Sequence, residues 1–181
     1  MIRVRPASKA DATRLAQLDA TYTAGERALA LERSGDAPEL SFALRWRSGT
    51  AREENYGSFD EERVRGALAL TDLFLVAEDG ETVAGVLMVV VPTWTDAGEI
   101  TDLVVDRGAR RSGVGRTLVE SATSWARQRE LRGLWVEPGA DNGGAIAFYL
   151  SLGFRVAGFN DRWNAVDTDE RPTVFMYREL R

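Results

Sequence analysis

A glycine-containing loop between a predicted strand and a predicted helix constrains the fold more than any other feature of this sequence. Residues 99–105 (EITDLVV) have two partly apolar faces, as a strand in the middle of a sheet does. The loop at residues 110–116 (RRSGVGR) follows, and residues 113–129 then form an amphipathic helix pattern with Val114, Leu118, Ala122 and Trp125 on one stripe. Such a strand–loop–helix unit predicts a sheet covered by helices, and therefore a mixed α/β fold.

The rest of the chain supplies further strands and helices for the same sheet. Alternation predicts a strand at residues 2–6, a hairpin of strands at 73–78 and 82–91, and strands at 134–137, 154–157 and 173–179. Helical spacing predicts a helix that starts at the capping-box-like Ser8 and continues through Leu15, Leu18 and Tyr22, and further helices at 60–70 and 143–152. Residues 23–59 are punctuated by glycine, proline and charges, so short helices and loops are expected there. The length of 181 residues predicts a single domain over residues 1–181.

Two residue types are absent from the sequence, and their absence narrows the chemistry. The chain has no cysteine and no histidine. This excludes thiolate nucleophiles, Ser-His-Asp triads and the usual Cys or His metal sites, so no metal is expected. Acid–base chemistry must therefore use Asp, Glu, Tyr, Lys or the backbone.

Charge and hydropathy restrict the partners and the compartment. The net charge of −5 argues against a nucleic-acid-binding protein, which needs a basic face, and is compatible with a cationic substrate. The longest apolar run, at residues 83–91, is interrupted by Gly85 and ends at Pro92, so it is too short to span a membrane. The amino-terminal residues lack the apolar stretch of a signal peptide, and the cytoplasm is the expected location.

The glycine loop has the features of a phosphate-binding cradle. Gly113 and Gly115 let the backbone approach a ligand closely, and the first N–H groups of the following helix lie at the positive end of its dipole. Arg110, Arg111 and Arg116 add positive charge nearby. The loop is neither a Walker A sequence, which needs Lys-Ser/Thr, nor a dinucleotide fingerprint, which needs a third glycine. A tight turn with solvated arginines is the alternative interpretation.

A second motif begins at Asn142 and ends at Phe154. Asn142 is suited to capping a helix, and Tyr149 follows about two helical turns later, so both side chains can face the same side. The alternative interpretation gives Tyr149 a core position and Asn142 a purely capping role.

Together the two motifs resemble those of the GNAT acetyltransferases. Arg110-x-x-Gly113-x-Gly115 is similar to the Q/R-x-x-G-x-G/A loop of that family, and Asn142-x-x-Ala145-x-x-Phe148-Tyr149 is similar to its second cofactor motif. The resemblance covers residues 73–157, and residues 2–22 fit the family's opening strand and helix more loosely. It implies the GNAT fold, in which a central, mixed, mostly antiparallel twisted sheet is flanked by helices and splayed between its fourth and fifth strands.

The resemblance also implies acetyl-CoA as the co-substrate and assigns roles to individual positions. Backbone groups of a bulged strand would bind the pantetheine arm and orient the acetyl carbonyl, and these belong to Leu103, Val104 and Val105. The pyrophosphate would be bound by the loop and the helix start, which comprise Arg110, Arg111, Ser112, Gly113, Val114, Gly115 and Arg116. Asn142 would bind the pantetheine, and Tyr149 would protonate the leaving thiolate, a role that suits a phenol with a pKa of about 10.

A carboxylate is the natural general base because histidine is absent. A glutamate on the central strand often has this role in the family, which implies Glu99, and Asp102 and Glu137 are rival candidates. In a regular strand Asp102 faces the side opposite to Glu99, and a bulge would change that. Without cysteine no thiol acyl-enzyme can form, so the resemblance implies direct attack of the amine on the thioester.

The acceptor is predicted from a closer resemblance. Within the family the chain is most similar to streptothricin acetyltransferases, which modify an antibiotic. The residues that carry this similarity are Leu18-Asp19, Thr21-Tyr22-Thr23, Trp94, residues 133–137, Ala145-Ile146 and Phe175-Met176-Tyr177. Residues 160–163 and 23–59 depart from the pattern. A small-molecule amine is the expected acceptor, and a protein amino terminus or lysine is the first alternative. A non-catalytic acetyl-CoA sensor is the second, and the resemblance also allows a homodimer.

Acidic and aromatic side chains are candidate acceptor contacts. The acidic residues that would attract a polyamine-like acceptor are Glu99, Asp102, Glu137, Asp161, Asp167, Asp169 and Glu170. Trp94, Trp135 and Trp163 line a pocket in one interpretation and fill the core in the other. A solvated loop is the alternative for the acidic residues between 167 and 170.

Overall fold

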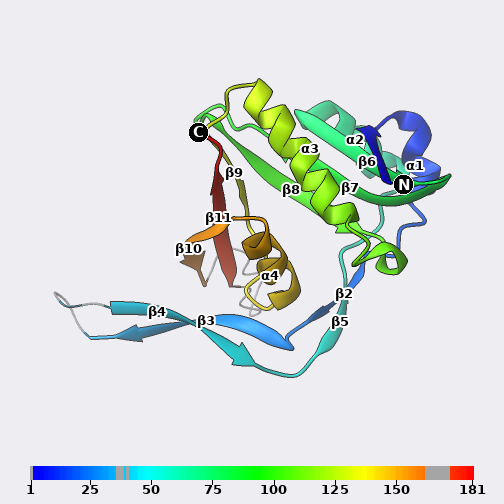
Figure 1. Ribbon diagram of the computed structural model, residues 1–181. Helices are drawn as coiled ribbons and strands as arrows, with labels where there is room; N and C mark the ends of the chain where they lie inside the picture. Colours follow the sequence, from blue (N-terminus) through cyan, green and yellow to red (C-terminus); the bar gives the residue numbers. More distant parts are fainter. Residues whose placement is uncertain (1, 36–38, 40, 162–171) are drawn as a thin grey trace. The chain divides into compact units, whose positions relative to one another are not determined.

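The chain divides into two units, each assembled from segments that are distant in the sequence (Figure 1). The computed structural model describes residues 2–35, 39, 41–161 and 172–181. The first unit comprises Met1–Tyr22, Asn55–Val136 and Arg178–Arg181, and the second comprises Thr23–Glu54 and Glu137–Tyr177. In the described part of the chain, the helices are too short or too polar to cross a lipid bilayer.

The first unit is built on a mostly antiparallel sheet. Five strands are neighbours in the order β1 (Ile2–Pro6), β6 (Leu73–Asp79), β7 (Thr82–Val90), β8 (Ala97–Val105) and β9 (Gly133–Val136). The pairs β1–β6, β6–β7 and β7–β8 are antiparallel, and β8–β9 is parallel. The mixed sheet that the sequence predicted is therefore confirmed.

Helices cover both faces of this sheet. Alternate residues of β7 point in opposite directions, and a Cβ on Gly85 would meet Val114 and Leu118 of α3 (Val114–Gln128). Met88 belongs instead to a core cluster with Leu15 and Val64, which lie on α1 (Ala12–Leu15) and α2 (Glu61–Leu70). A short helix, η1 (Lys9–Asp11), precedes α1. Figure 1 shows α3 running across the strands β6, β7 and β8.

The sheet separates beside β8, as the resemblance implied. Three consecutive residues of β8, Ala97 to Glu99, pair with Gly133 to Trp135 of β9. β8 continues to Val105, whereas its parallel pairing ends at Glu99. Within this unit, the part of β8 that follows Glu99 therefore pairs with β7 and not with β9.

The second unit contains two antiparallel hairpins and a helix. β3 (Arg27–Ser34) pairs with β4 (Ser41–Ser48), and β10 (Arg155–Asn160) pairs with β11 (Thr173–Glu179), whose last two residues belong to the first unit. The helix is α4 (Gly143–Ser151). Gly143 packs against β3 so closely that a Cβ would lie 2.9 Å from the Arg27 side chain. Two further short strands, β2 (Thr21–Ala24) and β5 (Arg52–Asn55), pair with each other.

Two sequence predictions were wrong in this region. Residues 23–59 hold β3, β4 and β5 instead of short helices and loops, because the charged side chains that interrupt the pattern form ion pairs across the hairpin. Glu32 on β3 pairs with Arg45 at 2.8 Å and also contacts Arg47. The first helix ends at Leu15, and Tyr22 lies in β2, so the helical spacing that continues to Tyr22 is coincidental.

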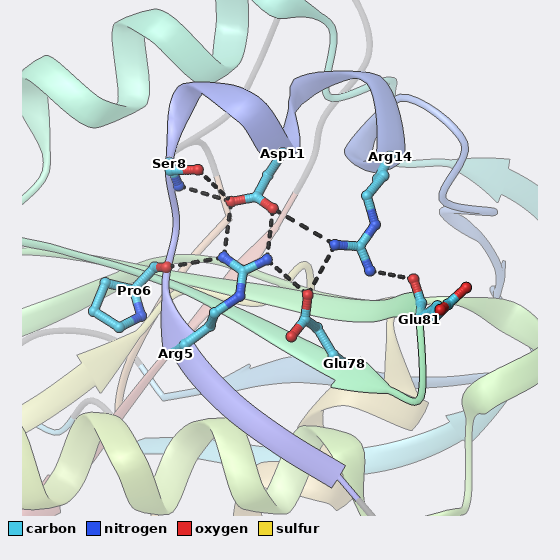
Figure 2. Close-up of polar contacts among 7 residues, drawn as sticks. All are labelled: Arg5, Pro6, Ser8, Asp11, Arg14, Glu78 and Glu81. Atoms are coloured by element: carbon cyan, nitrogen blue, oxygen red, sulfur yellow. Dashed lines mark hydrogen bonds and ion pairs between the residues drawn. The ribbon is translucent and has the colours of Figure 1, made fainter.

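A charge network ties the first helix to the sheet, as Figure 2 shows. Arg5 of β1 donates to both carboxylate oxygens of Asp11, at 2.9 and 2.6 Å, and to Glu78 of β6 at 2.7 Å. Arg14 of α1 donates to the same Glu78 oxygen at 2.8 Å. Asp11 and Ser8 form the predicted capping box. Because the Asp11 side chain is only 4% exposed, its pairing with Arg5 is part of the folded core.

We expect Asp11→Asn to lower the free energy of unfolding at pH 7 by about 2 kcal/mol. The hydrogen bonds from Arg5 lower the pKa of Asp11 from 3.8 to about 2. A lowered folded-state pKa stabilises the protein above the unfolded value, and this stabilisation is lost as pH falls from about 4 toward 2. Urea unfolding across this pH range should therefore show the gap between variant and wild type closing with acid.

A matched control for this measurement is Glu61→Gln. Glu61 also pairs with an arginine, Arg65, at 2.9 Å, but its side chain is 80% exposed. Exposed pairs within a helix contribute about 0.5 kcal/mol or less. Equal stability losses in Asp11→Asn and Glu61→Gln would show that the buried network adds nothing to the fold.

Candidate active site

The central strand β8 contains a β-bulge at Thr101. Two consecutive residues of β7 pair with Ile100 and Asp102, so Thr101 has no partner in that ladder. An extra residue of this kind reverses the alternation of side chains beyond it. Glu99 and Asp102 therefore lie on the same face of the sheet. The sequence put them on opposite faces of a regular strand and allowed a bulge to change this, and the structure has the bulge.

This shared face is the one that α1 and α2 cover. Asp102 lies opposite Met88, which packs in the core cluster beneath those helices, and Glu99 lies opposite Val90. Met88 is 2% exposed, whereas Val90 and Glu99 are both half-buried. The helices therefore bury the middle of the face and leave Glu99 partly open.

The far half of β8 presents backbone groups at its unpaired edge. Asp106 N donates to Ala84 O, which precedes Gly85 of β7, at 3.0 Å. In an antiparallel ladder, successive residues direct their N–H and C=O groups to opposite sides. Leu103 and Val105 therefore turn their backbone groups toward the edge where the pairing with β9 has ended. Val104, the third predicted strand position, turns its groups toward β7.

Arg110 fixes the glycine loop to the strand that precedes it. Its Nε donates to Val105 O at 3.1 Å, and its Nη2 donates to Thr21 O. A short helix, η2 (Arg107–Ala109), leads into the loop, and Asp106 caps it by accepting from Gly108 N at 2.9 Å. The sequence predicted that Arg110 adds positive charge near the loop, and the structure bonds its guanidinium to two backbone carbonyls.

The N-terminus of α3 has no side-chain cap. Its N-cap residue is Gly113, with a φ of 93°, and Arg111 two residues earlier also has a positive φ of 65°. The first N–H groups of a helix have no acceptor within it, and here they belong to Val114, Gly115 and Arg116. A Cβ on Gly113 would meet no atom within 4 Å. Open space, free donors and the helix dipole together suit an anion such as a phosphate.

Asp102 is held by two side chains that the sequence did not point to. Tyr56 Oη donates to Asp102 Oδ1 at 3.1 Å and to Thr101 O at 3.3 Å, and Arg63 Nη2 donates to the same Oδ1 at 2.8 Å. The Arg63 guanidinium also stacks 4.0 Å from the Phe59 ring centroid. Burial, and then the Asp102 carboxylate, raise the pKa of Tyr56, so its hydroxyl stays a donor at neutral pH. The Asp102 charge is thus balanced by Arg63.

Glu99 lies where β8 and β9 separate. It pairs with Trp135 in the last residue pair of the parallel ladder. The Trp135 ring lies 5.8 Å from that of Trp94, between the ring centroids, with the planes tilted by 35°. The Asp102 carboxylate is bound by Arg63, and Glu99 lies on the same face of β8 at the end of the parallel ladder.

The remaining predicted residues lie in the second unit. Asn142 caps α4 by accepting from Ala145 N at 3.0 Å. Tyr149, on the same helix, is 4% exposed and contacts Phe148 and Phe154 edge-on, with centroid distances of 5.3 and 5.2 Å. The predicted cap is confirmed, and the buried position of Tyr149 is the one that the alternative interpretation gave it. Glu137 also belongs to this unit and is half-buried.

The structure thus groups the predicted residues into two sets. The first unit holds Glu99, Asp102, the β8 edge and the glycine loop, and the second holds Asn142, Tyr149 and Glu137. Trp163, Asp167, Asp169 and Glu170 lie outside the described residues. Tyr56 and Arg63 were not predicted from the sequence, because their contact with Asp102 depends on the position of a bulge that the residue pattern does not reveal.

Known proteins resemble this chain in sequence. A model of the acetyltransferase (GNAT) family matches residues 40–154. Streptothricin acetyltransferase of Streptomyces lavendulae is 34% identical over 105 residues, which are 58% of this chain and 55% of that protein. The ribosomal protein bS18-alanine N-acetyltransferase of Escherichia coli K12 is 34% identical over 84 residues, or 46% of this chain and 55% of that protein. The chain spans about half the length of the curated relatives it matches.

Solved structures agree in fold. A nourseothricin acetyltransferase superposes with a TM-score of 0.82 at 23% identity, over 99% of both chains. A structure from Bacillus anthracis, provisionally assigned as a streptothricin acetyltransferase and bound to acetyl coenzyme A, superposes with a TM-score of 0.78 at 18% identity, also over 99% of both. At these identities the likeness shows the fold.

Proposed function

Because this chain belongs to the acetyltransferase (GNAT) family, we propose that it transfers an acetyl group from acetyl-CoA to a primary amine of a small cationic molecule. The observation that carries the proposal is the arrangement around β8. A strand edge that is not paired with β9 leads into a helix N-terminus without a side-chain cap, and the Glu99 carboxylate lies at the end of the parallel ladder. The similarity to streptothricin acetyltransferases points to an antibiotic of the streptothricin type as the acceptor.

The residues present fit acetyl-CoA. The N–H groups of Val114, Gly115 and Arg116, with the open space at Gly113, would hold the pyrophosphate. The backbone of Leu103 and Val105 would bind the pantetheine arm as an added strand binds a sheet edge. Arg111 and Ser112, both exposed, complete the loop, and Arg110 fixes the loop to β8 through its bond to Val105 O. Asn142 is assigned to the pantetheine as well. When bound, acetyl-CoA supplies an activated thioester.

The chain's own groups then carry out the proton transfers. Glu99 accepts a proton from the acceptor ammonium, which makes the amine a nucleophile. The backbone N–H groups at the β8 edge orient the acetyl carbonyl and stabilise the charge that develops on its oxygen. Tyr149 donates a proton to the departing thiolate. Since the sequence contains no cysteine, no thiol of the protein takes up the acetyl group, and transfer is direct.

A protein amino terminus is a second candidate acceptor. The bS18-alanine N-acetyltransferases of several enteric bacteria match this chain at 34–35% identity, which is as close as the streptothricin enzymes are over their matched segments. The small-molecule acceptor is preferred because the match to the streptothricin acetyltransferase covers more of this chain, 58% against 46% for the E. coli bS18 enzyme.

Release of CoA thiol in the presence of a thiol-reactive dye tests the proposal directly. The protein has no cysteine and gives no background of its own. With acetyl-CoA and a panel of streptothricin, spermidine, free lysine and short peptides, we expect rapid release with streptothricin and slow or no release with peptides. Release with peptides alone would support the second candidate. Bound acetyl-CoA without release for any amine would contradict acetyl transfer.

A further inference from the structure

Two tryptophans form a partly exposed aromatic pair beside the proposed base. Trp135 is the pairing partner of Glu99, and paired residues of neighbouring strands project from the same face of a sheet. The Trp94 ring packs on Trp135 with 5.8 Å between centroids. Trp94 is 78% exposed, which is unusual for so large an apolar side chain.

The turn that carries Trp94 is fixed to β9. Thr95 N donates to Pro92 O at 3.1 Å and closes the turn. Asp96 then bonds twice to Arg132, the residue before β9: its backbone oxygen accepts from Arg132 N at 2.9 Å, and its carboxylate pairs with Arg132 Nε at 2.6 Å. The backbone on the carboxyl side of Trp94 is therefore held in place.

Other tryptophans in this chain already carry a cation on their rings. The Arg129 guanidinium lies 4.5 Å from the Trp125 ring centroid, and that of Arg27 lies 4.4 Å from the Trp46 ring centroid. Among the residues that the structure describes, no arginine covers Trp94 or Trp135. The exposed Trp94 ring and the Trp135 ring therefore carry no cation of the described residues, and Trp135 is the strand partner of Glu99.

We propose that Trp94 and Trp135 bind a cationic group of the acceptor beside Glu99. An ammonium is attracted to the face of an indole, and a nearby carboxylate adds to that attraction. This inference rests on the proposed function and narrows its substrate to acceptors with at least two amines. Glu99 deprotonates one amine, which is then acetylated, and the other amine remains protonated and lies against the tryptophan pair.

The test is the Michaelis constant for streptothricin in the full-length protein with Trp94→Leu and Trp94→Phe. Leucine keeps an apolar side chain but has no aromatic ring, and phenylalanine keeps a ring that attracts cations less strongly than an indole does. We expect Trp94→Leu to raise this constant about three- to tenfold and Trp94→Phe to raise it less, while the Michaelis constant for acetyl-CoA stays within about twofold. Leu70→Ala is the matched control, since Leu70 is also 78% exposed, on α2, and should change neither constant.

A pair of probes separates charge from size. Choline carries a quaternary ammonium, and its neutral isostere 3,3-dimethylbutanol has the same shape. Choline should compete with streptothricin in the wild type and not in Trp94→Leu, and the neutral isostere should compete in neither. Equal competition by both probes, or unchanged constants in Trp94→Leu, would overturn the inference.

A binding measurement keeps this inference separate from the proposed function. If no amine causes thiol release, the proposed function fails, and titration calorimetry with spermidine still tests the tryptophan pair. Spermidine binding that weakens in Trp94→Leu supports the pair as a cation site. Spermidine binding that is absent, or equal in both proteins, contradicts it.

Discussion

Replacing Glu99 with glutamine is expected to lower kcat for acetyl transfer at pH 7 by about two orders of magnitude, within the range that a general base contributes. Glutamine keeps the shape of glutamate but cannot take a proton from the attacking ammonium. Glu99 is half-buried at the point where β8 and β9 separate, so the change should leave the fold and the β8 edge intact. Acetyl-CoA affinity, measured by titration calorimetry, should be unchanged.

The pH dependence of this variant distinguishes a base from a binding residue. An aliphatic amine loses its proton without help as pH approaches its own pKa of about 10. The deficit of Glu99→Gln in kcat should therefore shrink steadily as pH is raised from about 7 toward 10. A deficit of constant size over this range would show that Glu99 does not act by accepting a proton.

Asp102→Asn is the matched control because Asp102 lies on the same face of the same strand. Its carboxylate is engaged by Tyr56 and Arg63, so it has little capacity to act as a base. We expect a loss of kcat below about tenfold, together with a lower melting temperature, because Arg63 loses a partly buried partner. A larger loss of kcat in Asp102→Asn than in Glu99→Gln would identify Asp102, and not Glu99, as the general base.

The parts of the structure that depend on local pattern could be predicted from the sequence. The strand β8, the glycine loop and α3 follow each other without long-range information, and hydrophobic periodicity located them to within a few residues. The capping role of Asn142 and the buried position of Tyr149 are also local. These elements are the ones on which the acetyl-CoA assignment depends.

The parts that depend on pairing between distant segments could not be predicted. The β3–β4 hairpin was missed because its strands carry charges that only a partner strand neutralises, as Arg45 does for Glu32. The resemblance implied a bulged strand, but the position of the bulge at Thr101 is visible only in the register with β7, and it decides which carboxylates share a face. The nearness of Trp94 to Trp135 likewise follows from the parallel pairing of β8 with β9. Acceptor contacts are mostly of this second kind.

Replacing Tyr149 with phenylalanine is expected to lower kcat by one to two orders of magnitude and to leave acetyl-CoA affinity within about twofold. A thiolate with a pKa near that of cysteine, about 8.5, leaves more readily when a phenol with a pKa of about 10 donates a proton to it. Phenylalanine keeps the ring that packs edge-on against Phe148 and Phe154, so only the hydroxyl is lost. Steady-state kinetics and titration calorimetry on the same preparations measure the two quantities.

A packing control is needed because Tyr149 is 4% exposed, and any change at so buried a site can act through stability. Phe148→Leu removes the neighbouring ring without touching the hydroxyl, so it should lower the melting temperature more than Tyr149→Phe and reduce kcat less. This opposite ranking of stability and turnover is what a proton donor predicts. If both variants lose turnover in proportion to their loss of stability, Tyr149 supports the packing of α4 and has no part in the chemistry.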